Sequence, residues 1–426
     1  MSILILNRGP LARRPYAEWL RDHPDPLVLL ASEASLKKTG DTLPEPGQGY
    51  VHTESVAGYE EGGPLFDRAL ELHETFGFKY VVASQERDLE LAGRLRDRLG
   101  LPGQSEHSAR AFRDKLVMKR HAVAGGIPVA PHRPVENAGQ LREFAAGHGL
   151  PLVVKPRDSA GSVGVRVLRD TAAVEALIAD PEAWRISTGG VGMLAEGFVE
   201  GTMYHVDGIV LDGRIAAAWP SVYHYRLGDF ALTPGPRLDV ALDRDDPMGK
   251  RVMDFTEDVI RALPTPQHTT FHAEMFHTPD DRLVLCEIAS RNGGALISVV
   301  LRTMFGVHFP EAWVRASCDA PVPVPRDGGR MQPARLAGEV TFLKRRGLVR
   351  AIPDEVPFPW VTKYETPLRP GMWSPGPAAS ADFMAAMVAY GDTRAEVESR
   401  LHEVSRWFLD ALDIDPAAEG PEGSDR

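Results

Sequence analysis

Short apolar runs alternate with amphipathic helical stretches over the first hundred residues. Ile3–Leu6, Leu27–Leu30 and Tyr80–Ala83 are apolar runs rich in β-formers, whereas Leu65–Phe76 and Glu86–Leu99 have helical spacing. Strands that are separated by helices pair in parallel, because the helix carries the chain back along the sheet. The first hundred residues therefore predict a small parallel α/β unit.

The pattern becomes β-rich in the middle of the chain. A single helix is expected over Ala109–Ala124, and from Leu150 to Val199 apolar β-runs surround a glycine-rich loop. Two hairpins follow, one turning at Asp212-Gly213 and the other near Pro279–Asp281. Asp-Gly is a strong signal for a tight turn. This part of the chain is therefore expected to form antiparallel β-structure.

The length of the chain indicates several structural units. With 426 residues and a hydrophobic fraction of 43%, the chain is larger than a single core supports. Single cores stop growing at roughly 250–300 residues, so two or three units are expected. The last unit starts near Gln332 and carries a helix over Thr393–Leu412, and the polar tail Pro416–Arg426 is expected to fray.

Charge and cysteine content exclude some classes of function. A formal net charge of −11 argues against a general nucleic-acid binder or anionic-membrane binder. No apolar stretch approaches the ~20 residues of a spanning helix, and the first apolar run is too short for a signal-peptide core. Cys286 and Cys318 lack metal-like spacing and are expected to be buried, which suits a reducing cytoplasm. We therefore expect a cytoplasmic protein.

Two lysines and a loop of small residues form the first candidate site. Lys115 lies in the expected helix, Lys155 closes the apolar strand Leu152–Pro156, and Asp158–Val165 forms the loop. Small residues let backbone N–H groups approach phosphate oxygens closely. A solvated helix face, a lysine at a strand end and an ordinary hairpin turn are the structural alternatives. Because the loop directly follows Lys155, the combination favours a phosphate site.

The segment Met193–Gly201 is the second candidate. It reads as a strand that ends in Glu196, Phe198 and Val199. The backbone of such a strand end can read the edge of an adenine ring while the two apolar side chains form walls around it. An ordinary strand end is the structural alternative for this segment.

Two glutamates in the second hairpin form the third and most specific candidate. Strand side chains alternate between faces, so Glu287 shares a face with Leu285 and Ala289 and is expected to be buried. If the hairpin turns near Pro279–Asp281, Glu274 lies opposite Glu287, and two buried like charges destabilise a sheet. Magnesium that binds both carboxylates and nucleotide phosphates would resolve this conflict. A register slip of one residue would separate the two faces and remove the argument.

Taken in this order, the features resemble the ATP-grasp superfamily over roughly Ser105–Gly306. The pieces Gly201–Gly208 and Cys286–Gly294 look like those of bacterial amino-acid ligases and carboxylate–amine ligases. The resemblance implies an α/β (α+β) ATP-grasp fold. It divides the chain into a Rossmann-like parallel α/β domain at 1–104, an ATP-grasp domain at 105–328 with a lid subdomain within 105–199, a small C-terminal α/β domain at 329–415 and a flexible tail at 416–426.

The resemblance also assigns roles to individual residues, with ATP and Mg²⁺ as cofactors. The residues implied to contact ATP are Lys115, Lys155, Ser159, Gly161, Ser162 and Gly164 at the phosphates, and Glu196, Phe198 and Val199 around adenine. Glu274 and Glu287 are implied to hold magnesium. The residues implied to face the acyl phosphate or the substrates are Arg291, Asn292, His205 and Asp207, with Arg291 and Lys155 as catalytic residues.

Two positions depart from the family pattern. Ala289 stands where many members have the asparagine of Glu-x-Asn, a third metal ligand. Met203 stands where many members have a glutamate for the ribose hydroxyls. Asn292 and Asp207 are the candidate replacements, and neither departure removes the lysines or the carboxylate pair.

The resemblance implies a reaction in which a carboxylate, most simply that of an amino acid, is activated as an acyl phosphate and joined to an amine. ADP and phosphate are then released. Acyl transfer to a carrier-protein thiol, and a nucleotide-binding module without turnover, are the alternatives. The expected partners are small-molecule carboxylates and amines, without nucleic acid or membrane, and a homodimer is the commonest closed assembly. The aromatic stretch Trp219–Arg226 is expected to be a lid loop or a packed surface loop.

Overall fold

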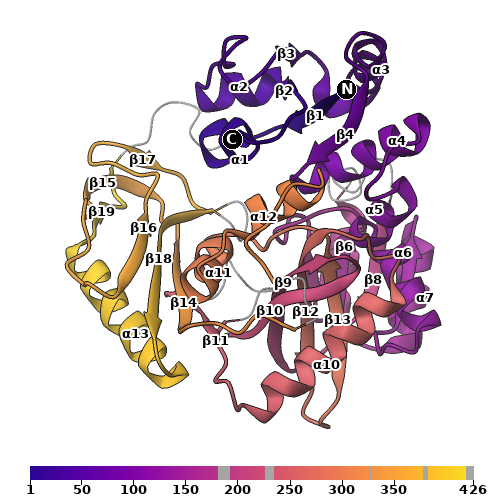
Figure 1. The fold of residues 1–426 in the computed structure, drawn as a ribbon. Coiled ribbons are helices and arrows are strands. Elements are labelled where there is room, and N and C mark those ends of the chain that lie inside the picture. Colours follow the sequence, from indigo (N-terminus) through magenta and orange to yellow (C-terminus); the bar gives the residue numbers. More distant parts are fainter. Residues whose placement is uncertain (181–191, 226–234, 326–328, 378–381, 419–426) are drawn as a thin grey trace.

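The computed structural model describes residues 1–180, 192–225, 235–325, 329–377 and 382–418, and its strands form four sheets (Figure 1). Residues 419–426 of the expected tail and Arg226 of the aromatic stretch lie outside the described residues. No helix in the described part of the chain is long and apolar enough to cross a bilayer.

The N-terminal unit contains the predicted parallel sheet. Its four strands run in the order β3-β2-β1-β4 and are all parallel. The strands are β1 (Ser2–Asn7), β2 (Leu27–Ser32), β3 (His52–Val56) and β4 (Phe78–Ala83), and the helices are α1 (Tyr16–Trp19), α2 (Glu33–Thr39), α3 (Gly63–Phe76) and α4 (Leu89–Leu99). The sequence did not predict β3, an edge strand of His-Thr-Glu-Ser-Val that lacks an apolar run. The parallel α/β prediction for this unit is confirmed.

The helix predicted over Ala109–Ala124 is wrong in one respect, because the structure has two helices there. These are α5 (Glu106–Arg113) and α6 (Lys115–Ala124), separated by Asp114 in an extended conformation with φ −84° and ψ 107°. The Asp114 carboxylate accepts hydrogen bonds from the backbone N–H groups of Leu116 and Val117, as an N-cap does. The break makes Lys115 the first residue of α6.

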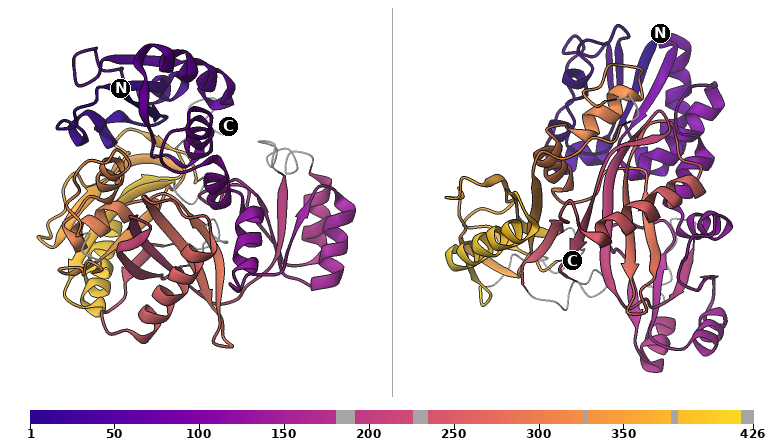
Figure 2. Two further views of the ribbon diagram at one scale, coloured as in Figure 1. Left: turned by 45° about the vertical axis from the view of Figure 1, so that its right-hand side comes forward. Right: turned by 60° about the horizontal axis from the view of Figure 1, so that its bottom comes forward.

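A second, smaller sheet forms a lobe that projects to one side of the molecule (Figure 2). Its antiparallel strands run in the order β5-β8-β6-β7 and enclose a small core around Leu141, Phe144 and Val154. The elements are β5 (His132–Val135), α7 (Ala138–His148), β6 (Leu152–Pro156), β7 (Arg166–Leu168), α8 (Thr171–Ala179) and β8 (Met193–Gly197). A lid subdomain was expected within residues 105–199, and that role of the lobe stays a prediction.

The largest sheet is antiparallel and has eight strands in the order β13-β12-β9-β10-β11-β14-β18-β16. The edge strand is β13 (Leu283–Ala289), and the next four strands are β12 (Thr269–His277), β9 (Thr202–Leu211), β10 (Arg214–Tyr223) and β11 (Arg237–Ala241). Both predicted hairpins are present: Asp212 and Gly213 turn with φ 52° and 75°, and the N–H of Thr278 donates to the carbonyl of Arg282. Trp219–Tyr223 belongs to β10 and is buried, so the loop expected for that stretch is wrong there.

The last part of the chain continues the large sheet. β14 (Leu336–Leu343) pairs with β11, and β18 (Phe383–Gly391) and β16 (Val361–Glu365) follow. A three-stranded sheet, β17-β15-β19, joins β15 (Gly347–Ala351), β17 (Trp373–Ser374) and β19 (Asp413–Asp415). The other helices are α10 (Pro247–Ala262), α11 (Ile297–Phe305), α12 (Phe309–Ala316) and α13 (Arg394–Ala411), the last matching the predicted C-terminal helix. The domain division at residue 328 stays a prediction, but strands from both sides of it pair directly.

Candidate functional site

A cavity of about 670 Å³ is lined by the lobe that contains the sheet β5-β8-β6-β7, by α6 and by the β12–β13 hairpin of the large sheet. Ligand sites typically enclose about 300–1,000 Å³, so the space suits a nucleotide. The lysines and acidic residues that line the cavity are Lys115, Lys119, Lys155, Glu196, Glu200, Glu274 and Glu287. Of the eleven residues assigned above to ATP or magnesium, all except Gly164 line this cavity.

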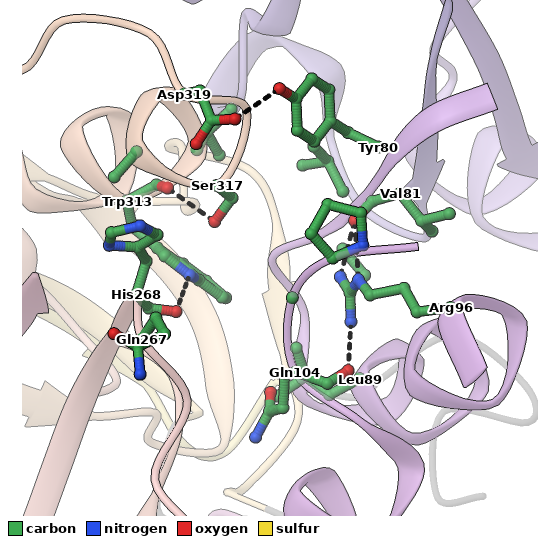
Figure 3. A pocket seen from close by; sticks show the side chains of 16 residues that line it. Tyr80, Val81, Leu89, Arg96, Gln104, Gln267, His268, Trp313, Ser317 and Asp319 are labelled. Carbon is green, nitrogen blue, oxygen red and sulfur yellow. Dashed lines mark hydrogen bonds between the residues drawn. The ribbon is translucent and has the colours of Figure 1, made fainter. Parts of the chain in front are cut away.

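A smaller cavity of about 190 Å³ lies between β4, α4 and α12 (Figure 3). The Arg96 guanidinium donates to the carbonyls of Val81 and Gln104, and the Tyr80 hydroxyl donates to Asp319 at 2.6 Å. None of the predicted site residues, all of which belong to the described part of the chain, lines this space. The larger cavity is therefore the candidate functional site.

Lysines surround Glu196 at the back of the cavity. Lys155 Nζ in β6 lies 2.8 Å from one Glu196 oxygen, and Lys119 Nζ in α6 lies 3.0 Å from the other. Burial alone would raise the pKa of Glu196, but the two lysines outweigh burial and lower that pKa to about 2. The side chain of Lys119 is only 1% exposed, and sequence analysis assigned it no role. Its i, i+4 spacing from Lys115 was the signal that could have identified it.

The glycine-rich loop after β6 is fixed over the lysines. Lys115 Nζ donates to the carbonyl of Ser159 at 2.6 Å, so the start of the loop is tied to α6. Gly161 and Gly164 have φ of 64° and 74°, and Ser162 has φ of 60°. Glycine adopts this left-handed region without a steric cost, which lets the backbone turn tightly and present N–H groups to an anion.

Apolar side chains form another wall of the cavity. Phe198 and Val199 follow β8, and Ala130 and Val153 line the same space. Met203, at the position where a ribose-binding glutamate was expected, is buried and also lines the cavity. A flat aromatic base fits such a wall because stacking removes apolar surface from water.

The β12–β13 hairpin places the two predicted glutamates opposite each other. Glu274 pairs with Glu287, whereas the next pair joins Met275 with Leu285, so Cys286 forms a bulge between them. The bulge breaks the alternation assumed for β13: Glu287 is 26% exposed and faces the cavity, so its expected burial with Leu285 is wrong. Cys286 is likewise half-buried at the cavity rather than in the core, while Cys318 is buried as expected.

Lysines already balance the charge of this carboxylate pair. Lys115 Nζ lies 3.3 Å from Glu287 Oε2. Burial would raise the pKa of Glu287, but Lys115 and Lys155 outweigh it and lower that pKa to about 2. Repulsion therefore does not force a metal into the site, contrary to the argument from sequence. Two carboxylates on adjacent strands beside a basic pocket nevertheless provide the oxygen ligands that Mg²⁺ prefers.

The four residues assigned to the acyl phosphate or the substrates do not line the cavity. Arg291 Nε donates to Glu86 of the N-terminal unit at 2.8 Å, and Glu86 also pairs with Arg113 at 3.3 Å. Asn292 follows Arg291, and its side-chain oxygen is buried without a hydrogen-bond partner among the described residues. Their roles stay predictions, as do those of the buried pair His205 and Asp207.

His205 and Asp207 belong to a buried polar network next to Glu274. Asp207 contacts His205 Nδ1 at 2.6 Å and His272 Nδ1 at 3.0 Å, and His205 Nε2 contacts Asp239 at 2.7 Å. Burial alone would lower the pKa of both histidines, but the neighbouring carboxylates raise that of His205 well above its ordinary value and that of His272 to about 9. Sequence analysis did not identify His272 or Asp239. The period-two spacing of His205 with Asp207, and of His272 with Glu274, on buried strands was the available signal.

Sequence comparison finds ligases among the similar proteins. The chain is 26% identical over 257 residues to an L-arginine-specific L-amino acid ligase of Bacillus subtilis, covering 58% of this chain and 60% of that protein. It is 31% identical over 199 residues to a D-alanine–D-alanine ligase of Gloeobacter violaceus, covering 45% and 61%. The chain thus spans about 60% of the length of these two curated relatives. No protein-family model matches it.

Structural comparison covers almost the whole chain. An L-amino acid ligase from Bacillus licheniformis superposes with a TM-score of 0.74 and 16% identity, covering 98% of this chain and 99% of that one. A carboxyaminoimidazole ribonucleotide synthase from Aspergillus clavatus, complexed with ATP, superposes with a TM-score of 0.68 and 18% identity, covering 96% and 99%. At these identities the superpositions establish the fold. The chain therefore has the ATP-grasp fold, and part of its sequence is similar to amino-acid ligases.

Proposed function

We propose that the protein is an ATP-dependent carboxylate–amine ligase that forms an amide, most simply between two amino acids, with release of ADP and phosphate. One observation carries the proposal: three buried lysines and the paired carboxylates Glu274 and Glu287 line the same nucleotide-sized cavity. The similarity to amino-acid ligases supports it, since both similar proteins named above by sequence join amino acids. The cavity also has an apolar wall at Phe198 and Val199 for the base.

The proposed reaction has two steps. A substrate carboxylate oxygen attacks the γ-phosphorus of ATP, the bond to the bridging oxygen breaks, and ADP leaves with that electron pair. An amine then attacks the carbonyl carbon of the acyl phosphate, loses a proton and expels inorganic phosphate. The attacking carboxylate and the phosphate are both anionic, so the positive charges of Lys115, Lys119 and Lys155 lower the barrier of the first step. Mg²⁺ held by Glu274 and Glu287 would neutralise further charge on the phosphate oxygens.

Lys115 has to exchange partners during this reaction. In the structure its ammonium group contacts Glu287 and the Ser159 carbonyl, between the metal-ligand pair and the glycine-rich loop. With ATP and Mg²⁺ bound, Lys115 would contact a phosphate oxygen and Glu287 would hold the cation, so neither charge would be left unpaired. The loop that begins at Ser159 would then cover the acyl phosphate and limit its hydrolysis by water.

Nucleotide analysis tests the proposal. The protein incubated with ATP, Mg²⁺ and pooled amino acids is expected to release ADP and phosphate, with dipeptides detected by mass spectrometry. Glu287→Gln is expected to lower the turnover number by about 100-fold or more, because a transition-state charge contact is lost. Glu143→Gln in α7, which breaks an exposed ion pair with Arg133, is the matched control and should keep full activity.

Other outcomes would identify the alternatives. AMP and pyrophosphate as the main nucleotide products would contradict γ-phosphoryl transfer. ADP release that requires an added carrier-protein thiol would replace the amine with a thiol acceptor. Nucleotide binding without turnover of any carboxylate would reduce the protein to a binding module.

A further inference from the structure

A network of alternating carboxyl and imidazole side chains runs across the large sheet and ends at Glu274. It starts at Asp239 in β11 and passes through His205 and Asp207 in β9 to His272 in β12. The successive contacts are 2.7 Å, 2.6 Å and 3.0 Å, and His272 Nε2 lies 3.3 Å from Glu274 Oε1. All of these residues are buried. The network therefore connects Glu274, a predicted metal ligand, to groups that do not line the cavity.

Strand register brings these residues together. Asp207 lies directly opposite His272 in the β9–β12 pairing, and His205 lies opposite Glu274. On its other side His205 faces Ser221 of β10, whose small side chain leaves room for the imidazole to reach Asp239 on the following strand. Gly293 packs closely against Asp207, because a Cβ at Gly293 would lie 2.8 Å from Asp207 Oδ1. The strands around the network thus keep its side chains buried.

Protons, rather than a metal ion, account for the contacts inside the network. Both Nδ1 atoms face Asp207, and both Nε2 atoms face a second carboxyl group, so each imidazole bridges two carboxyl groups. Two zinc ligands at ~2.0–2.1 Å in tetrahedral geometry would lie about 3.3 Å apart. The contact between His205 Nδ1 and Asp207 is 2.6 Å, which is much shorter than that separation and suits a short hydrogen bond.

The last contacts of this side-chain network fix the orientation of Glu274. The Tyr223 hydroxyl donates to Glu274 Oε1 at 3.2 Å, and His272 contacts the same oxygen. The Tyr223 ring in turn stacks on His205, with 4.4 Å between the ring centroids. Since both contacts fall on Oε1, Oε2 is the oxygen that is available to a cation in the cavity. A carboxylate held in this way loses little conformational freedom when it binds a metal.

We infer that Asp239, His205, Asp207 and His272 are positioning residues that hold Glu274 in its metal-binding orientation. The inference rests on the proposed function, in which Glu274 binds Mg²⁺. Networks that orient metal ligands contribute about 10–100-fold to metal affinity. A merely structural role would lower the stability of the protein and leave the metal affinity of the folded protein unchanged.

Metal titration of the full chain tests the inference. With ADP present, Asp207→Asn is expected to bind Mg²⁺ and Mn²⁺ about 10–100-fold more weakly by calorimetry, while ADP affinity without metal stays unchanged. Thr270→Val is the matched control, since Thr270 is buried on β12, the strand of His272 and Glu274, and its hydroxyl has no partner among the described residues. If Asp207→Asn does not fold, His205→Gln carries the same expectation. Unchanged metal affinity in a folded Asp207→Asn or His205→Gln protein overturns the inference.

A double variant separates this inference from the proposed function. If Asp207 acts through Glu274, Asp207→Asn combined with Glu274→Gln should bind metal no more weakly than Glu274→Gln alone. Additive losses overturn the positioning role. Normal metal affinity in Glu274→Gln overturns the metal assignment itself, and with it the premise. One equivalent of zinc in the purified protein, lost in Asp207→Asn, also overturns the inference by placing an ion where protons are assigned.

Discussion

Glu196 shows how single charges are balanced inside the cavity. Its carboxylate lies between Lys119 and Lys155, and all three side chains are at most 7% exposed. Removing one partner of a buried ion pair leaves a charge without compensation, which costs about 3–5 kcal/mol. Glu196→Gln is therefore expected to lower the free energy of unfolding by about that amount at pH 7, as measured by denaturant titration.

The difference in unfolding free energy between wild type and Glu196→Gln depends on pH in a definite direction. The lysines depress the pKa of Glu196 from its ordinary 4.5 to about 2 in the folded protein. A carboxyl with a depressed pKa stabilises the folded state above its unfolded pKa, and this contribution is lost as pH falls toward the folded pKa. The stability gap between wild type and Glu196→Gln should therefore be full above pH 4.5 and shrink toward about pH 2. A gap that stays constant over this range would contradict the assignment.

The break between α5 and α6 matters at the scale of elements. Asp114 caps α6, and its carboxylate also accepts a hydrogen bond from Arg157 Nε at 3.0 Å, which ties α6 to the end of β6. Asp114→Ala is expected to cost about 2–4 kcal/mol through the lost cap and the lost charged hydrogen bond. It should also weaken ATP binding, because Lys115 is the first residue of the helix that frays.

Asp170 provides the matched comparison for that prediction. It is an exposed aspartate that caps α8 through the N–H of Ala173. Asp170→Ala should cost only about 1 kcal/mol and leave ATP affinity unchanged. Thermal melts and ATP calorimetry on both variants check the pair. If Asp114→Ala and Asp170→Ala lost the same stability and the same ATP affinity, Asp114 would act only as a helix cap.

At the scale of the whole molecule, the pairing of β11 with β14 joins the C-terminal part to the rest. One hydrophobic core contains Leu4 of the N-terminal unit, Trp219 of β10 and Phe408 of α13. Gly338 in β14 lies at this junction, where a Cβ would be 2.6 Å from the Asp239 carbonyl oxygen. Gly338→Ala is expected to destabilise the protein by roughly 1–3 kcal/mol, because the backbone has to shift.

Gly147 in α7 is the control for this substitution. A Cβ at Gly147 meets no atom within 4 Å, so Gly147→Ala should be neutral or slightly stabilising. Gly338→Ala is also expected to shift Asp239, the first member of the network that ends at Glu274. Calorimetric unfolding should show one transition that moves to lower temperature in Gly338→Ala and does not move down in Gly147→Ala. Two separate transitions in wild type would contradict a continuous core.

Local sequence patterns predicted the local structure and many of the residues that line the candidate cavity. Period-two and helical spacing identified the parallel N-terminal sheet, both hairpins and the pairing of Glu274 with Glu287, because these features depend on neighbouring residues and tight turns. Lys155 and the glycine-rich loop were found in the same way, since a strand and the turn that follows it are local. The single helix at Ala109–Ala124 failed because the apolar spacing continues across the break at Asp114.

The contacts between charges that are far apart in the sequence depend on the packing of the whole chain. Lys119 reaches Glu196 from a helix some 77 positions earlier in the chain, and Asp239 reaches His205 across an intervening strand. The bulge at Cys286 turned Glu287 toward the cavity and Lys115, and the β11–β14 pairing merged the C-terminal strands into the large sheet. Sequence spacing can mark such residues as candidates, but it does not show which of them meet, because the register between non-adjacent strands is set by the packing of the whole sheet.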